Sequence, residues 1–110
     1  MNRLEHLLTI LTEECAEVQQ AVTKALRFGL NEGRDIDCTN AERLRQELND
    51  LIASVEMLVA EGVNLSADPV AKEMKKRKVE KYLLYSAECG TLEFNLPTNT
   101  DELPATGGDV

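Results

Sequence analysis

Aliphatic side chains recur at helical spacing along most of this chain, and this pattern constrains its fold more than any other feature. The first stripe, within residues 2–28, has members four and seven residues apart: Leu7, Leu11, Val18 and Ala25, with Leu4, Ala21 and Val22 beside them. Side chains at this spacing share one face of an α-helix, so the segment is predicted to be an amphipathic helix. Aromatic residues make up only 4% of the chain and Trp is absent. We therefore expect an aliphatic core built by helix packing.

Local start and stop signals predict where a second helix lies. Gly29 ends the first segment, because glycine readily adopts the backbone conformation that closes a helix. Thr39 followed three residues later by Glu42 is a capping box, so the second helix is expected to begin near Asn40 and to end at Gly62. We expect the Asn40 side chain to stabilise this start. The apolar stripe of this helix is Leu44, Leu48, Leu51, Val55 and Leu58.

A third helix is predicted to begin at Pro69, with Asp68 as its N-cap, and to end at about residues 86–88. Residues 89–110 contain no Lys or Arg and are rich in Thr, Pro, Gly and acidic side chains. Such a composition is typical of a flexible tail. Its candidate docking residues are Leu92, Phe94 and Leu96. We therefore expect one all-α domain over residues 1–88, followed by an acidic tail.

Charge and composition exclude several classes of protein. The net charge of −8 argues against a nucleic-acid binder, which needs a basic face to displace counterions. No apolar run reaches the length of a membrane span, and charges interrupt the first apolar pattern before a secretory signal could form. The cysteines fit no zinc or redox motif, so we expect reduced thiols in a soluble cytoplasmic protein, with Cys15 as a small buried side chain.

Two pairs of acidic residues interrupt the apolar pattern. Glu14 falls within about 20° of the centre of the first stripe, and Glu17 lies on its flank. Glu47 falls about 60° from the centre of the second stripe, with Asp50 farther round the same side. Carboxylates in an apolar interface must neutralise or bind a cation, and clustered hard oxygen ligands suit Mg²⁺ or Mn²⁺. Two acids three residues apart are also common on a solvated helix face, so the spacing alone leaves both interpretations open.

The residues around these acids carry a family resemblance. The sequence "EECAE" at Glu13–Glu17, followed by "ELND" at Glu47–Asp50, resembles the acidic signature of the MazG-like, all-α nucleoside triphosphate pyrophosphohydrolases. The longer segments "LTEECAEVQQAVTKALRFG" and "NAERLRQELNDLIASVEML" are similar to the first two core helices of that family. The resemblance extends over about residues 4–88. It depends on the order of the two acid pairs together with the sequence segments that flank them.

The resemblance implies hydrolysis of a (deoxy)nucleoside triphosphate to the monophosphate and pyrophosphate, by attack of water at the α-phosphate. Either Glu13 or Glu17 would orient or deprotonate that water. The Mg²⁺ ligands implied are Glu14, Glu17, Glu47 and Asp50. Bound metal would neutralise the triphosphate and lower the pKa of a bound water.

Basic residues supply candidates for binding the phosphates. Lys75, Lys78 and Tyr82 share one face of the third predicted helix, within a segment that carries half of the Lys and Arg of the chain. Lys24 and Arg27 follow the first acid pair on the first predicted helix. A solvated helix face explains about half of the basic segment equally well, and Arg27 also suits the negative end of a helix dipole.

Two other functions compete with the enzyme. A di-iron carboxylate bundle requires a Glu-x-x-His motif on two helices, and His6 is the only histidine in the chain. A non-enzymatic helical oligomerisation or adaptor module would carry its acids as exposed decoration. Several apolar residues fall outside the stripes, among them Ile10, Ile52, Val59 and Leu84. We therefore expect a homodimer or homotetramer with a four-helix core, which the family resemblance also implies.

Overall fold

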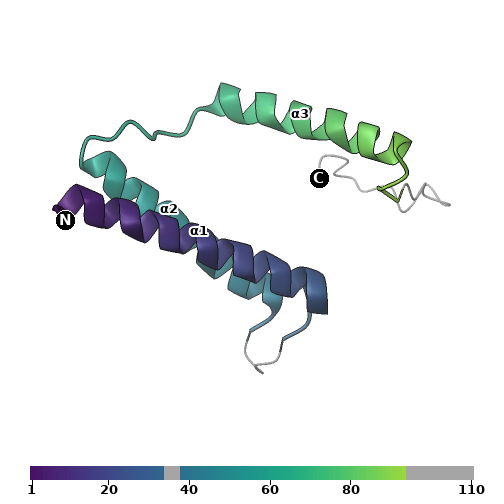
Figure 1. The fold of residues 1–110 in the computed structure, drawn as a ribbon, viewed down its shortest axis with the longest axis horizontal. Coiled ribbons are helices and arrows are strands. Elements are labelled where there is room, and N and C mark those ends of the chain that lie inside the picture. Colours follow the sequence, from purple (N-terminus) through teal and green to yellow (C-terminus); the bar gives the residue numbers. More distant parts are fainter. Residues whose placement is uncertain (34–37, 94–110) are drawn as a thin grey trace. The chain divides into compact units, whose positions relative to one another are not determined.

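The computed structural model describes residues 1–33 and 38–93 of the chain. Three α-helices follow one another there: α1 (Arg3–Phe28), α2 (Asn40–Ala60) and α3 (Pro69–Glu88) (Figure 1). These described ranges contain no β-strand, so the all-α prediction is confirmed for them. Each helix begins and ends within about two residues of its predicted limits, the usual uncertainty of a helix boundary.

The chain divides into two compact units, residues 1–66 and residues 67–110. The first holds α1 and α2, and the second holds α3. The sequence places a domain boundary after residue 88, and that boundary stays a prediction. Of the proposed docking residues of the tail, Leu92 is 36% exposed, whereas Phe94 and Leu96 lie outside the described residues.

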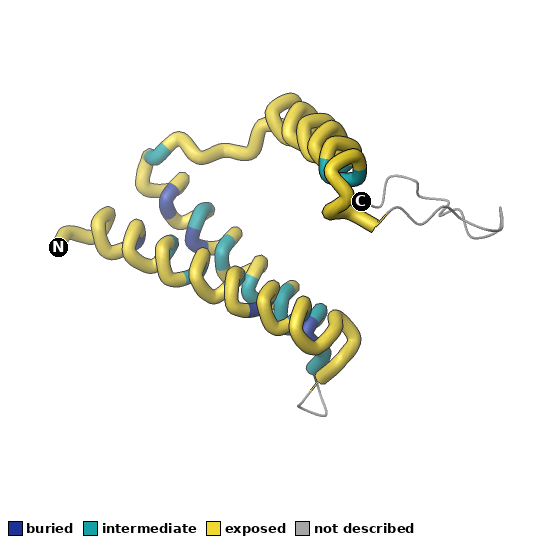
Figure 2. The backbone as a smooth tube through the Cα atoms, turned by 45° about the vertical axis from the view of Figure 1, so that its right-hand side comes forward, coloured by how far each residue is buried: buried dark blue, intermediate teal, exposed yellow. Residues whose placement is uncertain are grey.

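The first unit is an antiparallel pair, with α1 and α2 side by side along their length (Figures 1 and 2). Its less exposed positions alternate at spacings of four and three on both helices, the spacing of a coiled-coil seam. On α1 the seam positions are Leu7, Leu11, Glu14, Val18, Ala21 and Ala25. On α2 they are Asn40, Leu44, Glu47, Leu51, Ser54 and Leu58. Both helices therefore carry a glutamate at a position where an aliphatic side chain would normally pack.

The seam confirms the predicted stripe of α1 and corrects that of α2. Leu48, a predicted stripe member, is 40% exposed, whereas Ser54 is only 5% exposed. The Ser54 hydroxyl donates to the carbonyl oxygen of Leu51 at 2.8 Å, which satisfies this buried polar group. The prediction that Cys15 is buried is also wrong, because Cys15 lies beside the seam and is exposed. A helix that is apolar on more than one side does not reveal by itself which side faces its neighbour.

Capping interactions fix both ends of the connection between α1 and α2. Gly29, at a φ of 101°, closes α1, and its N–H donates to the Ala25 carbonyl oxygen. Thr39 caps α2 through the predicted box with Glu42, and hydrogen bonding to Thr39 lowers the pKa of the Glu42 carboxyl. The Asn40 side chain donates to the Gly29 carbonyl oxygen at 2.8 Å, which confirms its structural role.

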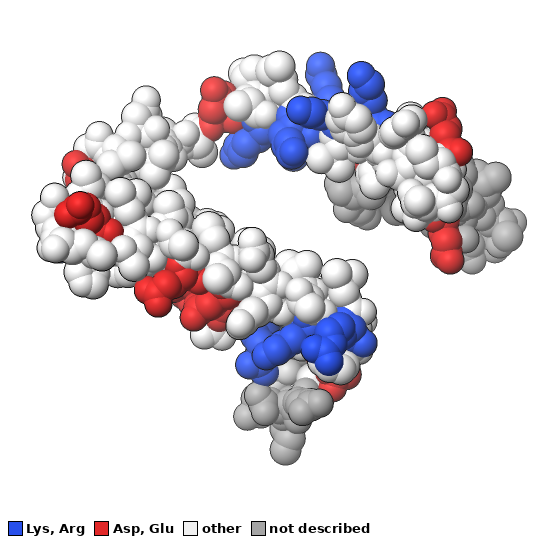
Figure 3. Space-filling view, in the orientation of Figure 1, with Lys and Arg blue, Asp and Glu red and all other residues white. Residues whose placement is uncertain are grey.

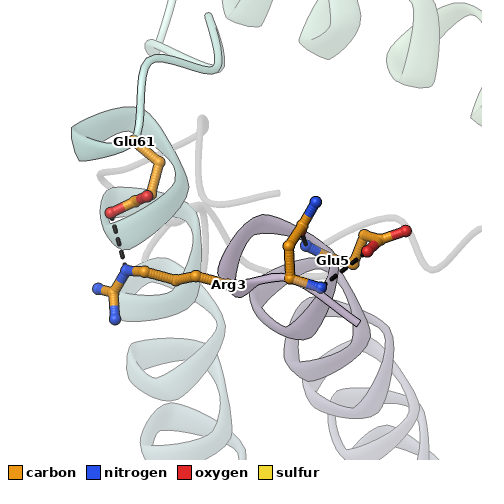
Figure 4. A network of polar contacts seen from close by, with 4 residues as sticks. Arg3, Glu5 and Glu61 are labelled. Atoms are coloured by element: carbon orange, nitrogen blue, oxygen red, sulfur yellow. Dashed lines mark hydrogen bonds and ion pairs between the residues drawn. The ribbon is translucent and has the colours of Figure 1, made fainter.

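A network of polar contacts lies at the other end of the pair, where α1 begins and α2 ends (Figure 4). Asn2 and Glu5 form a capping box at the start of α1. The guanidinium of Arg3 donates from Nε to Glu61, which follows α2, at 3.0 Å. An ion pair this exposed stabilises a fold by less than about 1 kcal/mol, so its main effect is on how the two ends are aligned.

The second unit contains α3 as its helical element. The Asp68 carboxylate accepts from the backbone N–H groups of Val70 and Ala71, and Pro69 occupies the first turn, as predicted. No residue of α3 is buried. None of the three described helices combines the length and the apolar character that crossing a bilayer requires.

Candidate metal centre

Three carboxylates from the two helices of the first unit converge near the middle of the seam. Glu14 comes from α1, and Glu47 and Asp50 come from α2. One oxygen from each lies within 4.8 Å of one from each of the others. Glu14 and Glu47 are half-buried, whereas Asp50 is exposed. The antiparallel pairing therefore joins residues that are more than 30 positions apart in the sequence.

Two oxygens of this cluster are buried without a hydrogen-bond partner among the described residues: Oε2 of Glu14 and Oε2 of Glu47. A buried polar atom of this kind is costly, because it has lost its water and gained nothing in return. Its nearest polar neighbours are other carboxylates, which cannot donate while they are ionised. The metal-free arrangement is thus electrostatically unfavourable, and a bound cation or proton would relieve it.

The pKa values of both seam glutamates respond to this crowding. Burial, a hydrogen bond with Glu17, and the charges of Glu17, Asp50 and Glu47 raise the pKa of Glu14 above its ordinary value. A hydrogen bond with Glu17, followed by burial and the charges of Glu17 and Asp50, raises the pKa of Glu47, which Arg43 partly offsets. Both shifts are in the direction expected of crowded carboxylates.

The donor set fits a hard divalent cation. All of the converging atoms are carboxylate oxygens, which Mg²⁺ and Mn²⁺ prefer. Opposite ligands of one Mg²⁺ lie about 4.2 Å apart, twice a bond length of about 2.1 Å. No two ligands of one such ion lie farther apart than that, and the three oxygens here all lie within 4.8 Å of one another, so small side-chain rotations would bring them within ligand range. Glu14, Glu47 and Asp50 can therefore hold such an ion together.

Glu17 and Glu13 are placed differently from the three converging carboxylates. The Glu17 carboxyl is exposed and lies close enough to Glu14 and Glu47 to raise the pKa of both. It also lines the groove beside the cluster, together with Glu47. Glu13 is exposed and belongs neither to the cluster nor to the lining of this groove. The structure thus places Glu17 beside the three converging carboxylates but not among them, and it leaves Glu13 outside both the cluster and the groove.

An open groove of about 250 Å³ continues from the carboxylates along one side of the helix pair. We call this side the polar flank. Its residues are Glu17, Gln20 and Lys24 of α1, and Arg43, Gln46 and Asp50 of α2. Acidic and basic side chains gather next to one another along this pair of helices (Figure 3). Because the helices are antiparallel, one end of the groove is acidic and the other end is basic.

The remaining predicted substrate contacts lie in two places. Lys24 lines the groove, whereas Arg27 lines a shallower hollow on α1 that also reaches Lys24. The Arg27 guanidinium lies 4.8 Å from the centre of the Phe28 ring in the last turn of α1. Lys75, Lys78 and Tyr82 are exposed on α3, in the second unit. Of the predicted basic contacts in the first unit, only Lys24 therefore adjoins the carboxylates.

Three polar groove residues are absent from the predicted site: Gln20, Arg43 and Gln46. Gln20 follows Glu17 by three positions, and Arg43 precedes Glu47 by four. Such neighbours share a helix face, so the spacing was a usable signal for both. Searches of the chain against protein-family models, curated protein sequences and solved structures find no significant match. Only the residues of the chain itself therefore bear on its function.

Proposed function

We propose that the chain hydrolyses a (deoxy)nucleoside triphosphate to the monophosphate and pyrophosphate with the aid of Mg²⁺, in the manner of the MazG-like enzymes that its acidic motifs resemble. The observation that carries this proposal is the pair of buried, unpartnered oxygens of Glu14 and Glu47, of which Glu47 lines the acidic end of the groove. Two buried, unpartnered carboxylate oxygens destabilise a helix pair that has only a structural role. In a metal-dependent enzyme the same oxygens serve as metal ligands.

Glu14, Glu47 and Asp50 would hold the metal, with Glu17 beside them. Mn²⁺ would serve as a substitute, since both ions prefer carboxylate ligands. Bound there, the ion would neutralise phosphate charge and lower the pKa of a water molecule. The residues of the chain then position the triphosphate along the groove and exclude other orientations. The acidic end receives the phosphate that reacts, and the basic end receives the phosphates that leave.

Glu17 is the better placed of the two candidate bases, because it lines the groove and Glu13 does not. In the proposed reaction the oxygen of a water molecule forms a bond to the α-phosphorus. The bond between that phosphorus and the oxygen bridging to the β-phosphorus breaks, and pyrophosphate leaves with the electron pair. Glu17 accepts the proton that the water loses and returns it to solvent.

We also propose that the chain functions as a homodimer or homotetramer. Large aliphatic side chains are exposed on the side of the helix pair opposite the groove, which we call the apolar flank. Its exposed aliphatic members are Leu4, Leu8 and Val22 of α1, and Leu48, Ile52 and Val59 of α2; the exposed Cys15 and the half-buried Val55 lie among them. Their spacings of three, four and seven repeat a coiled-coil seam on each helix. Pairing of two such flanks would make a four-helix core.

The proposed contacts on α3 are Lys75, Lys78 and Tyr82. Tyr82 and Tyr85 line a hollow of about 450 Å³ on that helix, where a tyrosine ring could stack on a nucleobase. The lysines would bind phosphate oxygens as flexible point charges. Because no residue of α3 is buried, replacing these side chains tests substrate binding with little effect on folding.

Pyrophosphate release from a panel of ribo- and deoxyribonucleoside triphosphates tests the proposed activity. The wild-type chain should release pyrophosphate from at least one triphosphate, only with Mg²⁺ or Mn²⁺. Glu47→Gln should reduce that release at least about 100-fold, since metal ligands contribute more than the residues that orient them. Glu56→Gln is the matched control, an exposed glutamate of α2 that undergoes the same change of charge.

Two results would contradict the proposal. One is that no triphosphate is cleaved by the wild-type chain with either metal. The other is that Glu56→Gln and Glu47→Gln reduce the release equally. In both cases, a non-enzymatic oligomerisation or adaptor module would be the better explanation of the helix pair.

A further inference from the structure

We infer that Lys24 and Arg43 form a clamp for the end of a polyphosphate chain remote from the metal, so that the groove selects diphosphate and triphosphate ligands over a single phosphate. The inference rests on the proposed function and names the residues that determine the substrate class. Arg43 is new to the site, and Lys24 acquires a defined partner. The two residues come from opposite helices and line the same groove.

The register of the antiparallel pair places the clamp. On α1, Lys24 lies seven residues after Glu17, and on α2, Arg43 lies seven residues before Asp50. Seven residues are two turns, and they span about 10 Å at a rise of about 1.5 Å per residue. Since the helices run in opposite directions, both cations end up at the same end of the groove and both carboxylates at the other. A single helix could not place carboxylates at one end and cations at the other end on both walls of the groove.

The length of the groove determines what can occupy it. Arg43 lies one turn from Glu47, but Lys24 lies two turns from Glu17, so a single phosphate held at the carboxylates would not engage both cations. A chain of two or three phosphates would reach them, with one phosphate at the acidic end and the last at the clamp. Two amide side chains, Gln20 and Gln46, line the groove between the ends and can donate to phosphate oxygens along the way. The groove volume of about 250 Å³ leaves the nucleoside outside it.

The chemistry of Arg43 and Lys24 suits the far end of the groove. A guanidinium offers paired donors that match the oxygens of a terminal phosphate. The Lys24 ammonium adds a second positive charge from the facing helix.

Calorimetric titration with inorganic pyrophosphate in the presence of Mg²⁺ tests the clamp. Lys24→Gln and Arg43→Gln should each weaken pyrophosphate binding about tenfold or more, as expected for the loss of a charge-assisted hydrogen bond. Arg45→Gln is the matched control, because Arg45 is an exposed residue of α2 that does not line the groove. It should bind pyrophosphate within about twofold of wild type, a difference much smaller than the loss of one such bond. Inorganic phosphate should bind weakly and equally to all four proteins.

Several outcomes would overturn the clamp: pyrophosphate does not bind to the wild-type chain, Lys24→Gln and Arg43→Gln bind it as the control does, or they lose affinity for phosphate to the same extent. A parallel triphosphate assay separates this failure from failure of the proposed function. If the two variants cleave triphosphates at the wild-type kcat/KM, the enzyme stands and the clamp fails. If no protein cleaves a triphosphate but the clamp variants still lose pyrophosphate binding, the clamp stands and the hydrolase proposal fails.

Discussion

The two flanks of the α1–α2 pair have opposite chemistry, although both are built on the same two helices. The polar flank carries carboxylates, amides and cations around an open groove. The apolar flank carries exposed aliphatic residues at coiled-coil spacing, such as Leu8 and Ile52. Between them lies the seam, in which Glu14 and Glu47 replace aliphatic side chains. The pair therefore gives up packing on the side of the groove and carries its exposed aliphatic residues on the other side.

The comparison extends to α3, which has no buried residue and no acid cluster. Replacing charged residues of α3 should not disturb a packed core, whereas replacing the glutamates of the seam should. The glutamates of α1 and α2 occupy positions on which the fold itself depends. The difference indicates where substitutions should impair function and stability together and where they should affect only one of them.

The largest expected effect is the loss of the proposed general base on the polar flank, Glu17. Glu17→Gln should slow triphosphate hydrolysis by about 100-fold or more, the usual contribution of general base catalysis. Steady-state kinetics should show the loss in kcat, because the amide keeps the shape of the side chain. Glu13→Gln, on the exposed neighbouring position, should stay close to wild type. A greater loss in Glu13→Gln than in Glu17→Gln would assign the base to the other glutamate.

A second expected effect separates the seam from α3. Leu58 is fully buried at 0% exposure, and Leu84 on α3 is 60% exposed. Leu58→Ala should lower the free energy of unfolding by about 2–5 kcal/mol, as for other large cavities. Leu84→Ala should change it by no more than about 0.5 kcal/mol. Urea denaturation followed by circular dichroism measures both. Equal losses would mean that α3 is packed as tightly as the seam.

A third expected effect concerns the apolar flank alone. Ile52 is 53% exposed on this flank. Ile52→Lys would bury an ammonium in the proposed four-helix core, so it should raise the dissociation constant of self-association by at least about tenfold. Sedimentation velocity at micromolar concentration measures the shift, and Lys72→Gln on α3 serves as a charge control. A wild-type chain that sediments as a monomer would contradict the oligomer proposal directly.

The smallest expected effect is the pH dependence of stability without metal. The raised pKa of Glu14 and of Glu47 contributes stability below the ordinary value of 4.5, which is lost as the pH rises through the shifted values. The lowered pKa of Glu42 has the opposite sign, so its contribution is present above 4.5 and is lost as the pH falls. Glu47→Gln in chelator should therefore melt higher than wild type at pH 7. Glu42→Gln should melt lower there.

Thermal melts from pH 4 to pH 8 with a chelator present would measure this difference. The gap between Glu47→Gln and wild type should widen as the pH rises, because Glu47 faces Glu17 and Asp50 across the cluster and only Arg43 opposes them. A gap that is independent of pH would contradict the electrostatic origin of the cost.

The limits of the helices were predictable because they depend on neighbouring residues. The Thr39–Glu42 capping box, the Asp68 cap and Gly29 each act within one turn. The facing side of α2 was not predictable in the same way. Leu48 and Leu51 are equally apolar, and only contact with α1 determines that Leu51 is in the seam and Leu48 is exposed. An isolated helical wheel contains no information about its partner.

The candidate site was likewise only partly predictable from the sequence. Glu14 could be recognised from α1 alone, because a carboxylate among aliphatic residues is unusual there. That its oxygen meets those of Glu47 and Asp50 depends on the antiparallel register of two helices. The spacing of Arg43 from Glu47 was a usable signal, but that Arg43 and Lys24 line the same groove depends on the register as well. The unusual chemistry of single residues could therefore be predicted from the sequence, whereas the contacts between the two helices could not.

The central claim is that Glu14 and Glu47 occupy the seam because a divalent cation binds there. The most direct test is the melting temperature as Mg²⁺ is titrated into wild type, Glu14→Gln, Glu47→Gln and the exposed control Glu13→Gln. Wild type and Glu13→Gln should rise by several degrees with Mg²⁺, because a ligand that binds the folded state stabilises it. Glu14→Gln and Glu47→Gln should begin higher and respond little. A wild-type chain that does not respond to Mg²⁺, or four proteins that respond alike, would contradict the claim.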